Sequence, residues 1–208
     1  SPYLIAPDDP ITARVMLVED GNNLEKHHPD PRDRGVSLAF VDGVRRGEAS
    51  LYQEDSVTGQ LARGVAGTHA CGAVIAGGDR AAEFTGITVQ RLVIWGSGLR
   101  AELPEVAGGW SWTVHSIADP SPDGPLKELQ TRMRQAEGHL AEKLGAEGLL
   151  VIVDGPLNYV RSRDLPVVGY IKTHHRALLD PPFHARLTGL APGERSSLFA
   201  LGDDRYSC

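Results

Sequence analysis

Three acidic residues occur in settings where their carboxylates could meet. Asp42 and Asp154 each follow a short apolar run and precede a glycine, in the phrase Val-Asp-Gly at 41–43 and again at 153–155. Glu137 lies between them in a segment with helical spacing. Carboxylates that converge repel one another unless a cation lies among them, and oxygen ligands suit Mg²⁺ or Mn²⁺. A pair of such ions binds phosphate oxygens, activates a water and stabilises a leaving oxygen. The three residues therefore predict a metal site able to hydrolyse a phosphodiester.

Glu137 belongs to a predicted helix over residues 125–144. The apolar residues of this segment recur at helical spacing and define one face: Leu126, Leu129, Met133, Ala136, Leu140 and Leu144. At about 100° per residue, Glu137 lies about 20° from the axis of that face. A carboxylate on a buried face is costly unless it is paired, protonated or bound to a cation. Two explanations stay open, namely a metal ligand, or a side chain at the margin that pairs with an arginine such as Arg134.

The remaining elements predict a mixed α/β sheet. A strand over 36–41 is expected to end at Asp42 and to form a hairpin with a second strand over 49–53, and further strands are expected over 61–75 and 87–95. Asp123 or Gly124 can cap the helix and Gly145 can end it. The apolar run 149–153 then predicts a central parallel strand that ends at Asp154, and a last strand over 167–171 leads to Lys172. Ligands gather beyond the carboxyl ends of such strands, although an aspartate there can also simply cap a turn.

Composition limits the class of protein. The chain has 208 residues, 41% of them hydrophobic, and a net charge of −6. This length suits one domain over 1–208, with its core at about 36–172. No apolar run approaches the roughly 20 residues of a membrane span, and a basic leader is lacking at the first residues, so the expected location is the cytoplasm. Two cysteines, Cys71 and Cys208, favour neither a disulfide framework nor a zinc site. The acidic balance argues against a passive nucleic-acid-binding surface, while residues 155–186 could form a modest basic face.

Weaker candidates lie elsewhere in the chain. The histidine pairs at 27–28 and 174–175 could bind a transition metal, although adjacent histidines on a strand point to opposite faces and favour a surface position. The Gly-Ser-Gly sequence at 96–98 lacks the rest of a phosphate-binding loop. Trp110 and Trp112 could stack on bases, or could be one core and one surface residue.

The order of these motifs resembles the NurA family of DNA-repair nucleases. The resemblance covers about residues 36–172. It rests on Val-Asp-Gly at 41–43, the inward Glu137, the phrase Val-Asp-Gly-Pro-Leu at 153–157 and the phrase Val-Val-Gly-Tyr-Ile-Lys at 167–172. These short motifs are moderately specific, and their order carries most of the weight.

The resemblance implies a fold, an activity and partners. The fold would be a ribonuclease-H-like mixed sheet with antiparallel hairpin strands, a crossover helix and parallel strands. The activity would be that of a Mn²⁺- or Mg²⁺-dependent 5′→3′ exonuclease and single-strand endonuclease in DNA end processing. Asp42, Glu137 and Asp154 match the family's metal-binding carboxylates, and Lys172 matches a lysine expected to hold a phosphate oxygen. The implied partners are DNA, a second copy of the chain and a hexameric HerA-type ATPase.

The chain departs from the family pattern at two places. Val44 follows the first Asp-Gly, where a serine is usual, and the family places a tyrosine and a histidine toward a C-terminus that we expect to be truncated or degenerate here. Candidate substitutes are His184, Asp203, Asp204 and Tyr206. Two alternatives therefore stay open: a catalytically inactive relative that docks on an ATPase or clamps DNA, and an unrelated α/β enzyme or nucleotide binder.

Overall fold

The computed structural model describes residues 15–21, 23–29, 36–54, 56, 59–77, 80–99, 101, 111–172, 179–201 and 206–208. The chain divides into two compact units, one comprising residues 1–33 and 173–208 and the other residues 34–172. The expected single domain over 1–208, with its core at about 36–172, stays a prediction. No helix within the described ranges is long and apolar enough to cross a membrane.

The larger unit is built on a six-stranded sheet with the order β6-β5-β4-β3-β7-β8. Three long strands, β3, β4 and β5, pair antiparallel, while β7 pairs parallel with both β3 and β8, and β6 pairs parallel with β5. The bounds are β3 Leu38–Glu54, β4 Leu61–Gly77, β5 Arg80–Trp95, β6 Thr113–Ser116, β7 Leu150–Asp154 and β8 Val167–Tyr170. One helix, α1 (Gly124–Ala146), connects the antiparallel part of the sheet to β7.

This strand order confirms the expected fold class. Three consecutive antiparallel strands, a crossover helix and two parallel strands placed beside the first strand make a ribonuclease-H-like mixed α/β sheet. The strand β5 is rich in the β-branched residues that favour strands, whereas β4 is rich in alanine and glycine, which are less common there, so the place of β4 depends on its pairing with β3 and β5. The strand β7 is a short apolar run, as expected of a strand with neighbours on both sides.

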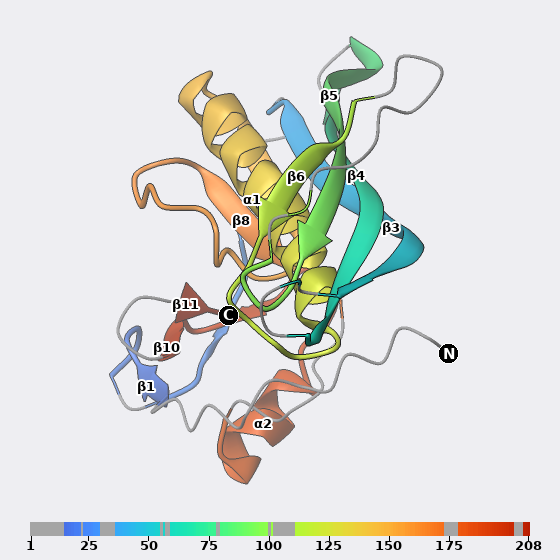
Figure 1. Ribbon diagram of the computed structural model, residues 1–208. Coiled ribbons are helices and arrows are strands. Elements are labelled where there is room, and N and C mark those ends of the chain that lie inside the picture. Colours follow the sequence, from blue (N-terminus) through green and yellow to red (C-terminus); the bar gives the residue numbers. More distant parts are fainter. Residues whose placement is uncertain are drawn as a thin grey trace. The chain divides into compact units, whose positions relative to one another are not determined.

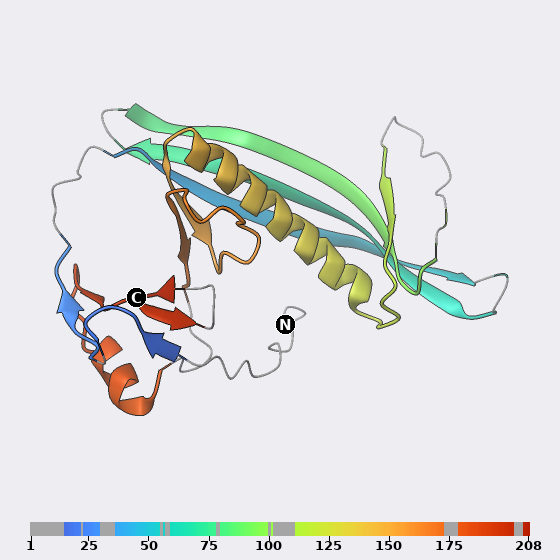
Figure 2. The same cartoon turned by 90° about the vertical axis from the view of Figure 1, so that its left-hand side faces the viewer.

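The helix α1 packs along one face of this sheet, as Figure 2 shows for the long strands β3, β4 and β5. Its expected apolar face is confirmed, because Leu129, Met133 and Leu144 are buried against the sheet. The main core lies between Ala141 and Leu144 of the helix and inward residues of three strands: Ala39, Val41, Cys71, Ala73, Val151 and Val153. A second cluster joins Leu129 to Leu92 and Ile94 of β5. The helix is therefore fixed over the centre of the sheet, with Glu137 between these clusters in the sequence.

The expected hairpin at residues 36–53 is wrong. The two expected strands are one continuous strand, β3, with an irregularity in its register between Gly47 and Ala49, and its hairpin partner is β4. Asp42 therefore lies within a strand and not at the end of one. The local Asp-Gly turn preference loses to long-range pairing, because Asp42 pairs with Gly72 and Gly43 with Cys71 of β4. The other departure is β6, a short strand that the sequence analysis did not expect.

The smaller unit contains two small antiparallel sheets and a short helix. One sheet has the order β1-β10-β11 and the other pairs β2 with β9. The bounds are β1 Val15–Leu17, β2 Lys26–His27, α2 Pro181–Leu187, β9 Arg195–Ser196, β10 Phe199–Leu201 and β11 Tyr206–Ser207. Figure 1 shows the elements of each unit along the chain. The core of the smaller unit is a cluster of Leu24, Leu179 and Phe199, against which Leu17, Phe183 and Leu187 pack.

Candidate metal centre

Asp42 and Asp154 lie side by side on neighbouring strands. The parallel register of β3 and β7 runs from Leu38 opposite Leu150 to Val41 opposite Val153, and the two aspartates are the next residues on each strand. Successive side chains of a strand point to opposite faces, and the preceding residues Val41 and Val153 face the helix. The two aspartates therefore share the other face of the sheet. Asp42 is exposed and Asp154 is partly buried.

Gly43 brings Glu137 to the same place from the helix side. A Cβ atom built on Gly43 would lie 2.7 Å from Oε1 of Glu137 and 2.9 Å from Cγ of Met133. Any side chain at this position would therefore push the helix residues away. The missing side chain opens the sheet backbone to Glu137 immediately beside Asp42, which explains how a helical carboxylate approaches a strand carboxylate on the opposite face.

The carboxylate of Glu137 is the most buried charged group of the site. The residue is 1% exposed, and Oε1 has no hydrogen-bond partner although it is fully shielded from solvent. Burial raises the pKa of Glu137, the cation of Arg134 opposes that rise, and the charges of Asp42 and Asp154 add to it. Burial is the largest of these causes, and the like charges of the two aspartates are the smallest.

Two cationic side chains already contact these carboxylates. Nη1 of Arg134 donates to Oε2 of Glu137 at 2.9 Å and to the backbone oxygen of Asp154 at 2.7 Å. Nζ of Lys172 lies 3.2 Å from Oδ2 of Asp154, and the Lys172 side chain is 61% exposed. The structure thus places all four residues predicted for the site, Asp42, Glu137, Asp154 and Lys172, around one region of the sheet. Their catalytic roles stay predictions.

Arg134 makes a contact with β7 that was not predicted from the sequence. It was considered only as an ion-pair partner that would leave Glu137 without a functional role. The structure gives it a second contact, to the end of β7. The spacing of three residues between Arg134 and Glu137 is the one sequence feature that indicates the pair, because residues three apart are neighbours on a helix surface. Nothing in the sequence indicates the contact with Asp154.

The donor set of this region fits a small divalent cation. Mg²⁺ and Mn²⁺ bind oxygen ligands and commonly use a few carboxylates together with water. The unpartnered Oε1 of Glu137 is an anionic oxygen that is buried without a hydrogen-bond donor, which is costly unless a cation contacts it. Asp42, Glu137 and Asp154 would supply the protein ligands of such an ion.

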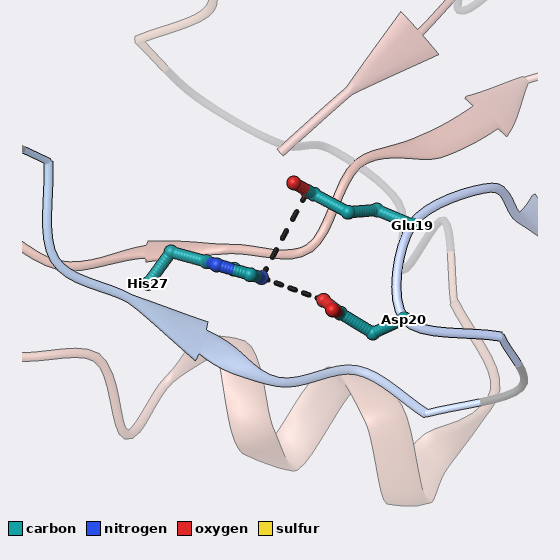
Figure 3. Close-up of side chains that lie close together, drawn as sticks. All are labelled: Glu19, Asp20 and His27. Carbon is teal, nitrogen blue, oxygen red and sulfur yellow. Dashed lines mark hydrogen bonds and ion pairs between the residues drawn. The ribbon is translucent and has the colours of Figure 1, made fainter.

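A second group of potential ligands lies in the smaller unit and is drawn in Figure 3. One ligand atom each of Glu19, Asp20 and His27 lies within 4.8 Å of the others. Nε2 of His27 is 2.6 Å from Oδ2 of Asp20 and 3.8 Å from Oε2 of Glu19. The sequence analysis had considered His27 as a metal ligand together with its neighbour His28, and the structure instead places it beside two acidic residues.

Protein groups already satisfy these two carboxylates. Arg195 forms a two-pronged ion pair with Glu19, at 2.7 and 3.0 Å, and the amide of Leu198 donates to Glu19 at 2.8 Å. These contacts, with the Arg195 hydrogen bond foremost, lower the pKa of Glu19 to about 2. The hydroxyl of Ser197 donates to Asp20 and, together with His27, lowers the pKa of that carboxyl. The cluster is therefore an ion-pair network that joins residues 19–27 to residues 195–198.

The other sequence candidates contribute little to the site. Gly96, Ser97 and Gly98 form a turn whose amides donate to Arg63, Asp119 and Ile117 backbone oxygens, so these amides are not available to a phosphate. His184 and Tyr206 lie in the smaller unit, the latter exposed. The candidates His174, His175, Asp203, Asp204 and Trp110 lie outside the described residues.

Comparison with known proteins gives a limited result. No protein-family model and no curated protein matches the chain. Among solved structures, the chain is similar to a protein described as the NurA nuclease from Sulfolobus solfataricus, with 14% sequence identity and a TM-score of 0.32 over 64% of this chain. The matched region spans 30% of the length of that nuclease. The family membership implied by the sequence motifs thus stays a proposal, and the fold class follows from the strand order described above.

Proposed function

We propose that residues 34–172 form a divalent-cation-dependent nuclease domain that hydrolyses phosphodiester bonds in DNA. The observation that supports this most strongly is the buried Oε1 of Glu137, which has no hydrogen-bond partner among the described residues and lies over Gly43, the residue after Asp42. A core glutamate destabilises a fold unless it is paired, protonated or bound to a cation, and Arg134 pairs with Oε2 alone. A bound Mg²⁺ or Mn²⁺ would compensate it and would supply Lewis-acid chemistry to a phosphate.

Each residue then has a defined part in the reaction. Asp42, Asp154 and Glu137 would hold the cation, which would act as a Lewis acid on the phosphate, and Gly43 keeps room for Glu137. Lys172 is exposed and bound to a single carboxylate oxygen, so its ammonium group is free to move to a non-bridging phosphate oxygen and to stabilise charge as it develops there. The alternative for Lys172 is a surface lysine whose stem covers the end of the strand.

DNA cleavage by defined variants tests this proposal. We expect the purified chain to degrade end-labelled single- and double-stranded DNA in Mn²⁺ or Mg²⁺ and to lose this activity in EDTA. Asp42→Asn and Glu137→Gln are expected to abolish cleavage, and Lys172→Ala to reduce turnover by about 10²–10³-fold, the usual effect of removing one electrostatic stabiliser.

Glu128→Gln is the matched control for Glu137→Gln. Glu128 lies on the same helix and pairs with Arg132 at 2.7 Å, so its loss removes a helical carboxylate and an ion pair without touching the site. It is expected to retain full activity. Absence of cleavage by the wild-type chain in either metal, or equal activity of Asp42→Asn and wild type, would refute the nuclease proposal. Unchanged cleavage by Lys172→Ala would remove only Lys172 from the site.

The finer parts of the proposal rest on the sequence resemblance to NurA nucleases. We propose 5′→3′ exonuclease and single-strand endonuclease activity in DNA end processing and repair, a homodimer, and docking on a HerA-type hexameric ATPase in the cytoplasm. Substrates labelled at either end give the polarity of digestion. Light scattering of the chain alone and with such an ATPase tests both assemblies.

A second candidate function is a catalytically inactive module of the same fold that docks on an ATPase or clamps DNA. The observation that favours it is that Arg134 and Lys172 already contact Glu137 and Asp154, so the chain itself neutralises part of the carboxylate charge. This candidate predicts DNA or ATPase binding without cleavage, with and without metal. The cleavage assay therefore separates the two functions directly.

A further inference from the structure

Arg134 joins the helix α1 to the end of β7 at the centre of the carboxylate group. A single nitrogen, Nη1, donates to Oε2 of Glu137 at 2.9 Å and to the backbone oxygen of Asp154 at 2.7 Å. A Cβ atom on Gly155, the residue after Asp154, would lie 3.7 Å from both terminal nitrogens of the guanidinium. The position of this cation is thus fixed from two elements at once, within the set of residues that would otherwise surround metal ions.

The two oxygens of Glu137 are consequently not equivalent. Oε2 accepts from Arg134, whereas Oε1 is buried and has no partner. A carboxylate that bridges two metal ions commonly gives one oxygen to each ion. Glu137 has one oxygen to offer as long as the Arg134 contact persists, and this geometry suits a single ion.

The charges in the region give the same result. Asp42, Glu137 and Asp154 carry three negative charges, and Arg134 and Lys172 carry two positive ones at 2.9 and 3.2 Å from carboxylate oxygens. The group therefore keeps one uncompensated negative charge. One divalent ion reverses its sign while Lys172 stays, or neutralises it when Lys172 is displaced, so no net negative charge remains to attract a second ion.

The side chains of Lys172 and Arg134 differ in how easily a metal ion can displace them from the carboxylates. Lys172 is a flexible point charge with a single contact and 61% of its side chain exposed, so an incoming ion can displace it. Arg134 has two contacts, is 31% exposed and cannot be deprotonated in a protein. Arg134 therefore remains when a divalent ion binds.

We propose that Arg134 occupies the place of a second metal ion, so that the site binds one divalent cation and not the pair that a group of three carboxylates would otherwise hold. This inference rests on the proposed function, since it concerns the same metal site. It assigns to Arg134 a positioning and charge-compensating role through Glu137, and it replaces the two-ion arrangement that the carboxylates alone suggest.

Metal binding, measured without DNA, tests the inference. Titration of Mn²⁺ followed by the electron paramagnetic resonance of the free ion gives stoichiometry and affinity for the wild-type chain and for Arg134→Met, which keeps much of the side-chain volume and removes the charge. We expect one Mn²⁺ ion per wild-type chain. For Arg134→Met we expect at least tenfold tighter binding of the first ion and binding of a second.

Arg132→Met is the matched control. Arg132 lies two residues earlier on the same helix and pairs with Glu128 at 2.7 Å, away from the three carboxylates. The Arg132→Met variant is expected to bind one Mn²⁺ ion with wild-type affinity. Arg134→Lys keeps a cation and is expected to stay at one ion, and circular dichroism verifies that each variant is folded.

The outcomes separate the inference from the function on which it rests. Two ions in the wild-type chain overturn the inference whatever the variants do, so a variant that fails to fold does not remove the test. Unchanged or weaker Mn²⁺ binding by folded Arg134→Met overturns it as well. One ion in the wild-type chain and two in Arg134→Met support it. Absence of Mn²⁺ binding in every protein overturns the proposed function and the inference together, whereas one wild-type ion with an unaltered variant overturns the inference alone.

Discussion

Gly43→Ala is expected to destabilise the protein and to weaken metal binding together. The new Cβ atom would lie 2.7 Å from Oε1 of Glu137, 2.9 Å from Cγ of Met133 and 3.2 Å from the backbone oxygen of Ala70. The oxygen of Ala70 belongs to the paired strand β4 and has little freedom to move, so the helix residues must shift. An extra methyl group in a packed interior costs about 1–3 kcal/mol. For a chain of this length we therefore expect the melting temperature to fall by about 2–12 °C.

Gly47→Ala provides the matched control on the same strand. Its Cβ atom would lie 3.6 Å from Cδ1 of Leu126, an ordinary van der Waals distance. The substitution lowers the entropy of the unfolded chain, and we expect no loss of stability, or a gain of up to about 1 kcal/mol.

Thermal unfolding and Mn²⁺ titration of both glycine variants provide the assay. Because Gly43→Ala displaces the unpartnered oxygen of Glu137, its Mn²⁺ affinity should fall at least tenfold while Gly47→Ala keeps the wild-type value. Equal stability of the two variants would refute the packing argument. A stable Gly43→Ala with unchanged Mn²⁺ affinity would show that Glu137 does not use this oxygen for metal binding.

Three further outcomes are expected. Iodoacetamide at pH 8 should modify the exposed Cys208 and spare Cys71 in the folded chain, because burial raises the pKa of Cys71 to about 11. Mass spectrometry after digestion measures the extent of modification at each cysteine. Leu129→Ala should cost about 2–5 kcal/mol in urea unfolding, since Leu129 is fully buried, and a smaller loss would mean that this part of the core collapses around the cavity. The ion pair with Arg195 lowers the pKa of Glu19 from 4.5 to about 2, so the stability that Glu19 contributes is present above pH 4.5 and is lost as the pH falls toward 2. In thermal melts at decreasing pH, Glu19→Gln should lack this acid-dependent loss. If the melting temperatures of both proteins fell in parallel with pH, the role of the ion pair would be contradicted.

The sequence predicts the elements of the larger unit better than their lengths. The apolar spacing from Leu126 to Leu144 gives α1 within about two residues at each end, because one face of the helix alone contacts the sheet. The same spacing places Glu137 on the buried face. Asp154 ends β7 as expected, and Gly155 follows it with φ of +92°, a conformation that favours glycine.

The errors occur where long-range pairing decides the structure. The Asp42-Gly43 pair has the composition of a turn, yet it lies inside β3 because both residues pair with β4 and because Gly43 leaves room for Glu137. The contact of Arg134 with the backbone of Asp154 links residues 20 positions apart through a backbone atom, which no residue type reveals. The network of Glu19 with Arg195 spans 176 positions and is equally invisible in the sequence.

The parallel pairing of β3 with β7 has a consequence for how the protein is made. Leu38 pairs with Leu150, so this part of the sheet closes only after the intervening chain, including two antiparallel strands and the whole of α1, has been synthesised. Contacts of such high sequence separation form late and slow the folding of a domain. On a ribosome, Asp42 is complete long before Asp154 exists, and a nascent chain that lacks β7 has no carboxylate pair. On the proposed function, the cation site therefore cannot assemble before β7 pairs with β3, and metal affinity would report on that pairing.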